Sequence, residues 1–205
     1  MKRLLLSARL IQNHVVNLLL DDAPDHITVC GQVIPIKTDF RTWIRFENTM
    51  LKDCDNEERF KAILDVMNGI YSDIPEFMDQ VLWFYQCGII QSGKGTGRAK
   101  RVYDFENDQY MIYSVFRQYY NIDLTTAQLH WWIFKQLFIE LPEDSTIKKV
   151  MMYRSIRITS SMSPEQRRYY AEMKRIYALP DNRTAEQRAA SFATLLAGGM
   201  NIKEP

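Results

Sequence analysis

Residues 103–158 decide the fold that the sequence predicts, and they read YDFENDQYMIYSVFRQYYNIDLTTAQLHWWIFKQLFIELPEDSTIKKVMMYRSIRI. Apolar residues recur in this stretch at the three- and four-residue spacing of helices that bury one face. A first helix is expected to be capped by Asp104 and to end at residues 121–123, a second to be capped by Thr125, and a third to start at Ser145. The stretch therefore predicts three helices joined by short turns, packed as a compact bundle that forms the core. The positions expected on the buried faces are Phe105, Ile112, Val115, Phe116, Tyr119, Leu129, Trp132, Ile133, Leu137, Leu141, Ile147, Val150, Met151 and Arg154.

Three carboxylates crowd the start of the first of these helices, at Asp104, Glu106 and Asp108. A similar cluster could hold a metal ion or act as an acid–base pair. Capping of backbone N–H groups and the positive end of the helix dipole explain the three residues with fewer assumptions. We therefore expect them to have a structural role.

The sequence His130-Trp131-Trp132 is the aromatic constellation that we weigh most closely. Consecutive helical residues point about 100° apart, so the two tryptophans are not expected to face the same core. Trp132 falls on the expected buried face, and Trp131 turns toward a flank with Gln128 and Lys135. Core packing is the first interpretation of the pair, and the alternative is that Trp131 anchors an interface. Trp131 is thus a candidate partner contact.

Four segments also carry a family resemblance. The segments are YDFENDQYMIYSVFRQYYNIDL, LHWWIFKQLFIELPEDS and YRSIRI, together with TDFRTWIRFENTM upstream. They resemble the bacteriophage gene-product-fifteen family, found in phages and prophages. The likeness covers roughly residues 16–180. Members of this family resemble the small proteins of the tail-morphogenesis block of long-tailed phages, between the major tail protein and the tape measure protein. The family provides no established biochemical activity to carry over.

The resemblance implies an assembly chaperone in the cytoplasm of the host bacterium. Such a protein would bind the tape measure protein or tail-tube subunits and keep them soluble until they polymerise. An alternative is a structural component that stays in the virion, for instance at a connector. Both the chaperone and the virion component could also associate with further copies of the same chain.

Composition agrees with a globular protein that acts through protein contacts. The 205 residues are 46% hydrophobic and 12% aromatic, which suits one domain with a sizeable core. Lys and Arg total 26 and Asp and Glu total 25, a net charge of +1 that gives no global attraction to nucleic acid or an anionic membrane. The cysteines Cys30, Cys54 and Cys87 form no C-x-x-C pair and indicate free thiols in a reducing compartment.

The N-terminal part is expected to contain a β-hairpin followed by helices. Residues 1–15 lack a signal-peptide pattern and are too polar to span a bilayer, so we expect a flexible arm or extension. Two β-prone runs within residues 26–36 flank Gly31-Gln32, which predicts a hairpin turn at that pair, with Pro35 in an edge strand. Gly88 is expected to end the last helix of this half. Three helices are expected here. The first starts at Thr38-Asp39. The second buries the stripe Phe60, Ile63, Leu64, Met67, Ile70 and Tyr71, and the third opens at Pro75 and buries Phe77, Val81, Leu82 and Tyr85.

A glycine-rich basic segment, residues 91–101, separates the two halves. Its Gly-x-Gly-x-Gly lacks the further residues of the dinucleotide and P-loop fingerprints, so a solvated loop is the first interpretation. The alternative is an electrostatic contact with an acidic partner or nucleic acid. The candidate contact residues are Lys94, Arg98, Lys100 and Arg101.

The C-terminal part begins with a helix at residues 164–178, opened by the capping box Ser163-Pro164-Glu165-Gln166. Its tyrosines and cations are typical of an amphipathic helix lying on a bundle. A nucleic-acid surface, formed with the basic loop, is the less favoured alternative. Residues 181–205 are expected to form a weakly attached helix and tail. Together these patterns predict a mainly α protein, a multi-helix bundle with a small N-terminal β-hairpin, whose single domain covers residues 16–180.

The sequence offers little for catalysis or metal binding. His14, His26 and His130 share no metal-ligand spacing, and no cysteine cluster or H-E-x-x-H motif occurs. No nucleophile, base and orienting residue form a recognisable set. We therefore expect neither catalytic residues nor a cofactor, a metal ion or an enzymatic activity.

Overall fold

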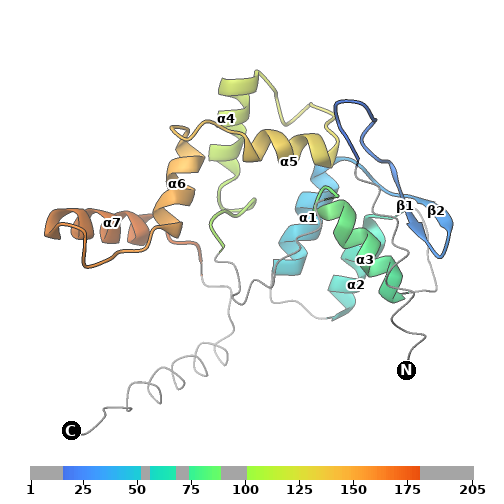
Figure 1. Ribbon diagram of the computed structural model, residues 1–205, viewed down its shortest axis with the longest axis horizontal. Helices are drawn as coiled ribbons and strands as arrows, with labels where there is room; N and C mark the ends of the chain where they lie inside the picture. Colours follow the sequence, from blue (N-terminus) through green and yellow to red (C-terminus); the bar gives the residue numbers. More distant parts are fainter. Residues whose placement is uncertain (1–15, 52–55, 68–73, 89–100, 181–205) are drawn as a thin grey trace, which may run out of the picture. The chain divides into compact units, whose positions relative to one another are not determined.

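The computed structural model describes residues 16–51, 56–67, 74–88 and 101–180 (Figure 1). Within these ranges the chain forms seven α-helices and one two-stranded antiparallel sheet near the N-terminus. The predicted mainly α fold with a small hairpin is confirmed. The expected arm at 1–15 and the tail at 181–205 lie outside the described residues. The chain divides into two compact units that alternate along the sequence, the first made of residues 1–43, 63–95 and 128–140 and the second of residues 44–62, 96–127 and 141–205.

The hairpin of the first unit consists of β1 (His26–Val29) and β2 (Gln32–Pro35), with His26 opposite Pro35 and Val29 opposite Gln32. Its turn residues are Cys30 and Gly31, with φ angles of 49° and 76°. A two-residue turn with positive φ at both positions matches the right-handed twist of the strands. The predicted hairpin is confirmed, but the turn lies one residue earlier than the expected Gly31-Gln32.

The hairpin buries one face against a helix of the same unit. β1 packs against α3 (Ile74–Tyr85). After β2 the chain continues beside residues 66–67, where the Lys37 N–H donates to the Val66 carbonyl and Ile36 pairs with Met67. The next helix, α1 (Phe40–Leu51), follows this segment directly in the sequence. The apolar side chains buried along this stretch are Ile27, Val29, Ile34, Ile36, Phe40 and Trp43.

Helix α3 ends where its glycine predicts. Gly88 has a φ of +72°, and its N–H donates to the Trp83 carbonyl, closing the last turn. Phe77 and Val81 are buried as expected, and Leu82 is 41% exposed instead. Phe84, which the pattern did not single out, is fully buried. The burial stripe of α3 is therefore Phe77, Val81 and Phe84, spaced by four and three residues.

The second unit contains α4 (Gln109–Tyr120), α6 (Thr146–Ser155) and α7 (Pro164–Ile176). α4 packs against α6, and α6 packs against α7. α4 ends at Asn121, which has a left-handed φ of 54°, so the predicted break at residues 121–123 is confirmed. The buried apolar side chains of α4 and α6 include Ile112, Val115, Phe116, Ile147 and Val150.

Of the three helices expected to form a bundle over residues 103–158, α4 and α6 belong to the second unit and α5 (Trp131–Ile139) belongs to the first. α5 also starts later than expected. The side chain of Asp123 accepts hydrogen bonds from the N–H and the hydroxyl of Thr125, which form a separate turn, and His130 is the N-cap. Tyr119 and Ile133, expected in the core, are 36% and 38% exposed. The division between the units falls within α1 and within α2 (Asn56–Asp65).

Candidate functional site

The two adjacent tryptophans of α5 are both buried, at 0% exposure for Trp131 and 1% for Trp132. Their indole N–H groups donate to consecutive carbonyls in the last turn of α3. Trp131 donates to Tyr85 at 2.9 Å, and Trp132 donates to Phe84 at 2.7 Å. Carbonyls at a helix C-terminus lack intrahelical partners, so two rings about 100° apart can both find acceptors there. The expectation that Trp131 is exposed is wrong, and we withdraw it as a partner contact.

Trp131 lies at the centre of an aromatic cluster in the first unit. Its ring stacks on Trp43 with centroids 6.3 Å apart, on Tyr85 at 5.7 Å and on Phe134 at 5.9 Å. The ammonium of Lys135 lies 5.1 Å from the Trp131 ring centroid, a cation–π distance. The flank that the helical pattern assigned to a surface is therefore the core of the first unit.

His130 positions the tryptophan pair. Its Nδ1 accepts the Trp132 backbone N–H at 3.0 Å, and its Nε2 lies 2.9 Å from the Pro24 carbonyl, to which it donates. Both contacts require the neutral ring with the proton on Nε2. Burial lowers the pKa of His130 below its ordinary 6.5, which favours that form. All three residues of the His130-Trp131-Trp132 motif thus serve the fold.

The basic loop contributes one described residue. Lys94, Arg98 and Lys100 lie outside the described residues. The guanidinium of Arg101 forms an ion pair with the carboxylate of Asp104, whose side chain is 2% exposed. Arg101 is therefore engaged within the second unit, next to a second and more deeply buried ion pair.

That second pair joins Arg154 of α6 to Asp108. The two terminal guanidinium nitrogens of Arg154 donate to the two carboxylate oxygens at 2.6 and 2.8 Å. The same guanidinium donates to the Val102 carbonyl at 3.0 Å and, through Nε, to the Tyr177 carbonyl at 2.6 Å. The side chains are 7% and 1% exposed. A bidentate, fully hydrogen-bonded pair is the arrangement in which buried charges are compensated.

The carboxylates before α4 have the structural role that the sequence favoured. Asp104 accepts the backbone N–H groups of Glu106 and Asn107 at 2.8 and 2.7 Å, and Asp108 accepts that of Asp104 at 2.9 Å. They form the turn that precedes α4 and do not cap the helix itself. Among the described residues no group of three or more His, Cys, Asp and Glu could hold a metal ion. The Arg154 partner was missed, because it lies 46 residues away in sequence.

Tyr103 and Glu47 extend this buried polar region of the second unit. Glu47 is only 6% exposed. Burial, and then the charge of the neighbouring Glu47 carboxylate, raises the pKa of Tyr103 far above its ordinary 10.0. The phenol therefore keeps its proton and serves as a hydrogen-bond donor to the carboxylate.

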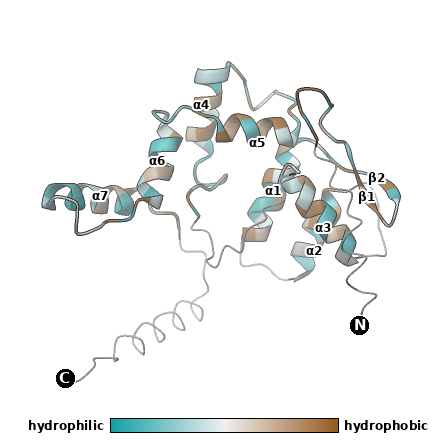
Figure 2. Ribbon diagram, in the orientation of Figure 1, coloured by the Kyte–Doolittle hydropathy of each residue, from teal (hydrophilic) through white to brown (hydrophobic). Residues whose placement is uncertain are grey.

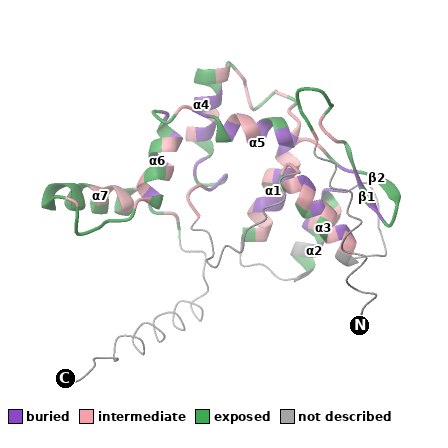
Figure 3. Ribbon diagram, viewed as in Figure 1, coloured by how far each residue is buried: buried purple, intermediate pink, exposed green. Residues whose placement is uncertain are grey.

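Helix α7 begins as its sequence predicts. The Ser163 hydroxyl accepts the Gln166 N–H at 3.2 Å, and the Gln166 side chain accepts the Ser163 N–H at 3.0 Å, a complete capping box. Yet none of its 13 residues is buried (Figure 3). A helix of this length is marginal alone in water, so its few contacts with α6 matter.

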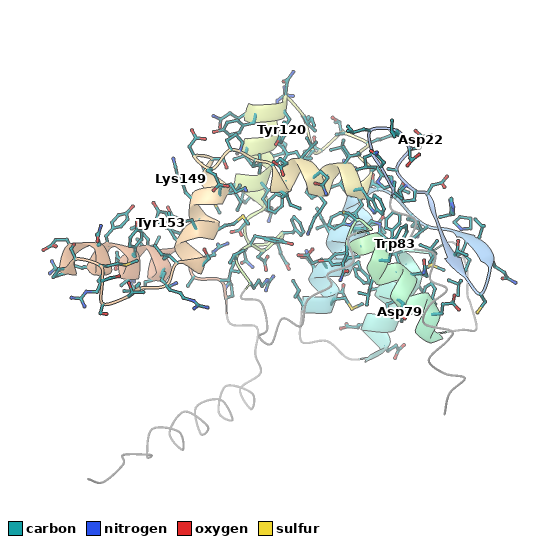
Figure 4. All side chains as sticks on the ribbon, in the orientation of Figure 1. Asp22, Asp79, Trp83, Tyr120, Lys149 and Tyr153 are labelled. Atoms are coloured by element: carbon teal, nitrogen blue, oxygen red, sulfur yellow. The ribbon has the colours of Figure 1, made fainter. Side chains whose placement is uncertain are left out.

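These contacts come from tyrosines and two cations. The hydroxyls of Tyr153 and Tyr169 lie 2.9 Å apart, and the Tyr153 ring, labelled in Figure 4, stacks on Tyr177 with centroids 5.8 Å apart. The ammonium of Lys174 donates to the Arg154 and Ile156 carbonyls at 3.2 and 2.5 Å, near the C-terminal end of α6. Arg154 therefore ties the end of α7 to the buried ion pair. No pattern of residue spacing in the sequence predicts that these residues meet.

One stripe of α7 carries three half-exposed apolar residues, the first of which also contacts Tyr153 of α6. Tyr169, Met173 and Ile176 are separated by four and three residues, which places them on one stripe. Tyr169 is 49% exposed and Ile176 is 53% exposed. Most of this helix is hydrophilic, in teal and pale shades in Figure 2.

Comparison with known proteins identifies a family. The chain matches the family described as Bacteriophage Gp15 protein over residues 19–179. No curated protein and no solved structure matches. In the part of the chain that the structure describes, no helix is long and apolar enough to cross a membrane. Because the matched residues cover most of its length, this chain belongs to the Bacteriophage Gp15 protein family.

Proposed function

We propose that this phage-family protein acts in tail morphogenesis as an assembly chaperone, in the cytoplasm of the host bacterium and without enzymatic activity. It binds the tape measure protein or tail-tube subunits and holds them until polymerisation. The family match supports a role in a phage. The position of related genes in the tail block, which the sequence resemblance implies, supports the choice of partners.

The observation that carries a binding role is α7. A helix with no buried residue is held in place by Arg154, Lys174 and Tyr153, so its shape is set although its surface is open. Ordering a surface before binding lowers the entropy cost of association. Tyrosine and arginine are the residue types enriched at protein interfaces. These features favour contact with another protein.

A second exposed feature, in the first unit, supports the same role. Leu19 and Leu20 are 93% and 82% exposed in a short turn. The turn is closed by hydrogen bonds, because Asn17 accepts the Asp21 N–H through its carbonyl and its own N–H donates to the Asp21 carboxylate. Adjacent exposed leucines in an ordered turn form an apolar contact surface.

Co-expression tests the proposal. The chain, carrying an affinity tag, is produced together with the tape measure protein or with the major tail protein of the same phage. We expect at least one of the two to co-purify with the chain, and its soluble fraction to rise. If neither protein co-purifies at about 150 mM salt, the proposed partners are wrong.

The virion-component alternative gives a different result. Purified particles would then contain the chain in a fixed ratio to the major tail protein, whereas a chaperone is absent from them. Quantitative mass spectrometry of purified particles separates the two roles.

A further inference from the structure

We infer that residues 17–25, which we call the leucine turn, dock into an apolar pocket bordered by lysine or arginine on a partner protein. The inference deepens the proposed function and rests on it for the existence of a protein partner. It adds the element of the first unit that docks and the chemistry of the pocket that receives it.

The leucine turn presents apolar side chains to solvent. Leu19 and Leu20 are 93% and 82% exposed, more than any other large hydrophobic residue in the described part of the chain. Their neighbour Leu18 is 37% exposed. Taking these side chains out of water favours association, because burial of apolar surface is the main driving force at protein interfaces. Two adjacent leucines in a short turn match a pocket better than a long groove.

Hydrogen bonds hold the leucine turn in one shape. The Asn17 carbonyl accepts the N–H groups of Leu20 and Asp21 at 2.8 and 2.7 Å. Near the other end, Nε2 of His130 donates to the Pro24 carbonyl at 2.9 Å, which ties the turn to the N-cap of α5. Because the turn is ordered before it binds, docking loses less conformational entropy than folding of a free segment would.

The leucine turn is also acidic. It contains three aspartates and no lysine or arginine, a net charge of −3, whereas the whole chain carries +1. Two of the aspartates have partners nearby, since Asp21 accepts the Asn17 N–H at 3.0 Å and a carboxylate oxygen of Asp25 lies 2.8 Å from Nδ1 of His26. The third, Asp22, is exposed and forms no ion pair within the described residues (Figure 4).

The position of Asp22 indicates that cations border the pocket. Consecutive Cα atoms are about 3.8 Å apart, so the Cα atoms of Leu20 and Asp22 lie within about 7.6 Å in any backbone conformation. A pocket that takes up the Leu20 side chain therefore brings its border close to this carboxylate. A lysine or arginine at that border would pair with Asp22, and a carboxylate there would be repelled.

The same charge argues against two other occupants. An anionic bilayer surface would repel a segment of −3. The leucine turn of a second copy carries the same −3, so docking one turn on the other would cost free energy. A partner pocket with an apolar floor and a cationic border matches both the leucines and the aspartates.

Site-specific cross-linking in phage-producing cells tests the inference. A benzophenone amino acid replaces Leu19, and the matched control places it at Leu82 of α3, a leucine that is 41% exposed. We expect a cross-link at position 19, and not at position 82, to another phage-encoded protein, with mass spectrometry placing it at apolar residues next to lysine or arginine. A cross-link to lipid, to a second copy, to residues 1–15 of the same chain, to a segment without cations, or none above the control would overturn the inference.

Binding measurements test the leucines and the aspartate separately. The double variant Leu19→Ser with Leu20→Ser and the charge reversal Asp22→Lys should each weaken co-purification with the cross-linked protein at least tenfold. The controls Leu82→Ser and Asp79→Lys, at exposed positions of α3, should not. Thermal melts of the turn variants should match wild type, which excludes unfolding as the cause. Reversing the charge of the cross-linked lysine or arginine should restore binding of Asp22→Lys, and an Asp22→Lys variant that binds like wild type would exclude the cationic border.

The same measurements separate this inference from the proposed function. If the tape measure protein or tail protein co-purifies equally with wild type and both turn variants, the function stands and docking through the leucine turn is wrong. If neither co-purifies with wild type but position 19 still cross-links to an apolar, cation-bordered segment of another phage protein, the docking element is right and the proposed partners are wrong.

Discussion

Helices α5 and α7 are both rich in aromatic residues, and their surroundings are opposite. α5 buries Trp131, Trp132, Phe134 and Phe138, and α7 buries none of its residues. The difference lies in what accompanies the rings. The aromatic residues of α5 stand among apolar neighbours and have hydrogen-bond acceptors waiting at the end of α3. Those of α7 are tyrosines between cations, which can stay at the surface without a large cost.

This comparison indicates which aromatic residues are candidates for contact with a partner protein. The most aromatic motif in the sequence, His130-Trp131-Trp132, packs in the core of the first unit. The less apolar helix offers the open surface. An exposed helix held in place by a few specific contacts is therefore better evidence for a partner than a run of tryptophans.

The largest expected effect tests the α5 half of this comparison. Trp131→Ala and Trp132→Ala should each reduce the free energy of unfolding by about 3–5 kcal/mol, because each empties a fully buried site. Tyr169→Ala on α7 should cost far less. Urea denaturation of the three variants checks this. A nearly neutral Trp131→Ala would show that its ring is not in the core.

The next effect concerns the buried ion pair between Arg154 and Asp108, whose arginine also binds the Tyr177 carbonyl at the end of α7. Arg154→Met leaves the Asp108 carboxylate buried without its cation, which should cost about 3–5 kcal/mol. Adding Asp108→Asn removes that charge and keeps an oxygen acceptor for the Asp104 N–H, so it should recover part of the loss. Denaturant melts of the single and double variants measure the coupling between the two residues. If the two changes are additive, the ion pair contributes nothing of its own.

A smaller effect tests the contact of α3 with α5. A Cβ at Gly88 would lie 3.0 Å from Cη2 of Trp132, whereas at Gly31 it would meet no atom within 4 Å. Both glycines have positive φ, so Gly31→Ala should cost about 1–2 kcal/mol from the backbone alone. Gly88→Ala should cost about 1 kcal/mol more from overpacking. Equal losses in thermal or urea melts would mean that the Trp132 ring yields without cost.

The smallest effect is the pH dependence contributed by His130. Because its pKa is lowered in the folded chain, the folded state binds this proton less readily than the unfolded state. The stabilisation is fully present above pH 6.5 and is lost as the pH falls through the folded pKa. His130→Asn keeps a capping acceptor but does not titrate. The difference in unfolding free energy between wild type and this variant should shrink from pH 8 to pH 5, and a constant difference would exclude the effect.

Local signals in the sequence predicted much of the fold. The hairpin around Gly31, the break at Asn121, the helix stop at Gly88 and the capping box at Ser163 each depend on residues within a few positions. Their chemistry allows few alternatives, so neighbouring residues are sufficient. These features are confirmed to within one or two residues.

The features that failed depend on partners far along the chain. Trp131 is buried because the Tyr85 carbonyl, 46 residues away, accepts its N–H, and Asp108 is paired because Arg154 is equally distant. Helical periodicity shows which residues share a face but not which element that face meets. For the same reason the openness of α7 followed only from the structure.

Hydrogen–deuterium exchange of the chain, alone and saturated with the co-purifying tape measure or tail protein, tests the central claim most directly. We expect the amides of α7, residues 164–176, to gain protection in the complex, while those of α5, residues 131–139, keep the protection they already have. A complex that protects α5 or the hairpin and leaves α7 unchanged would contradict the account.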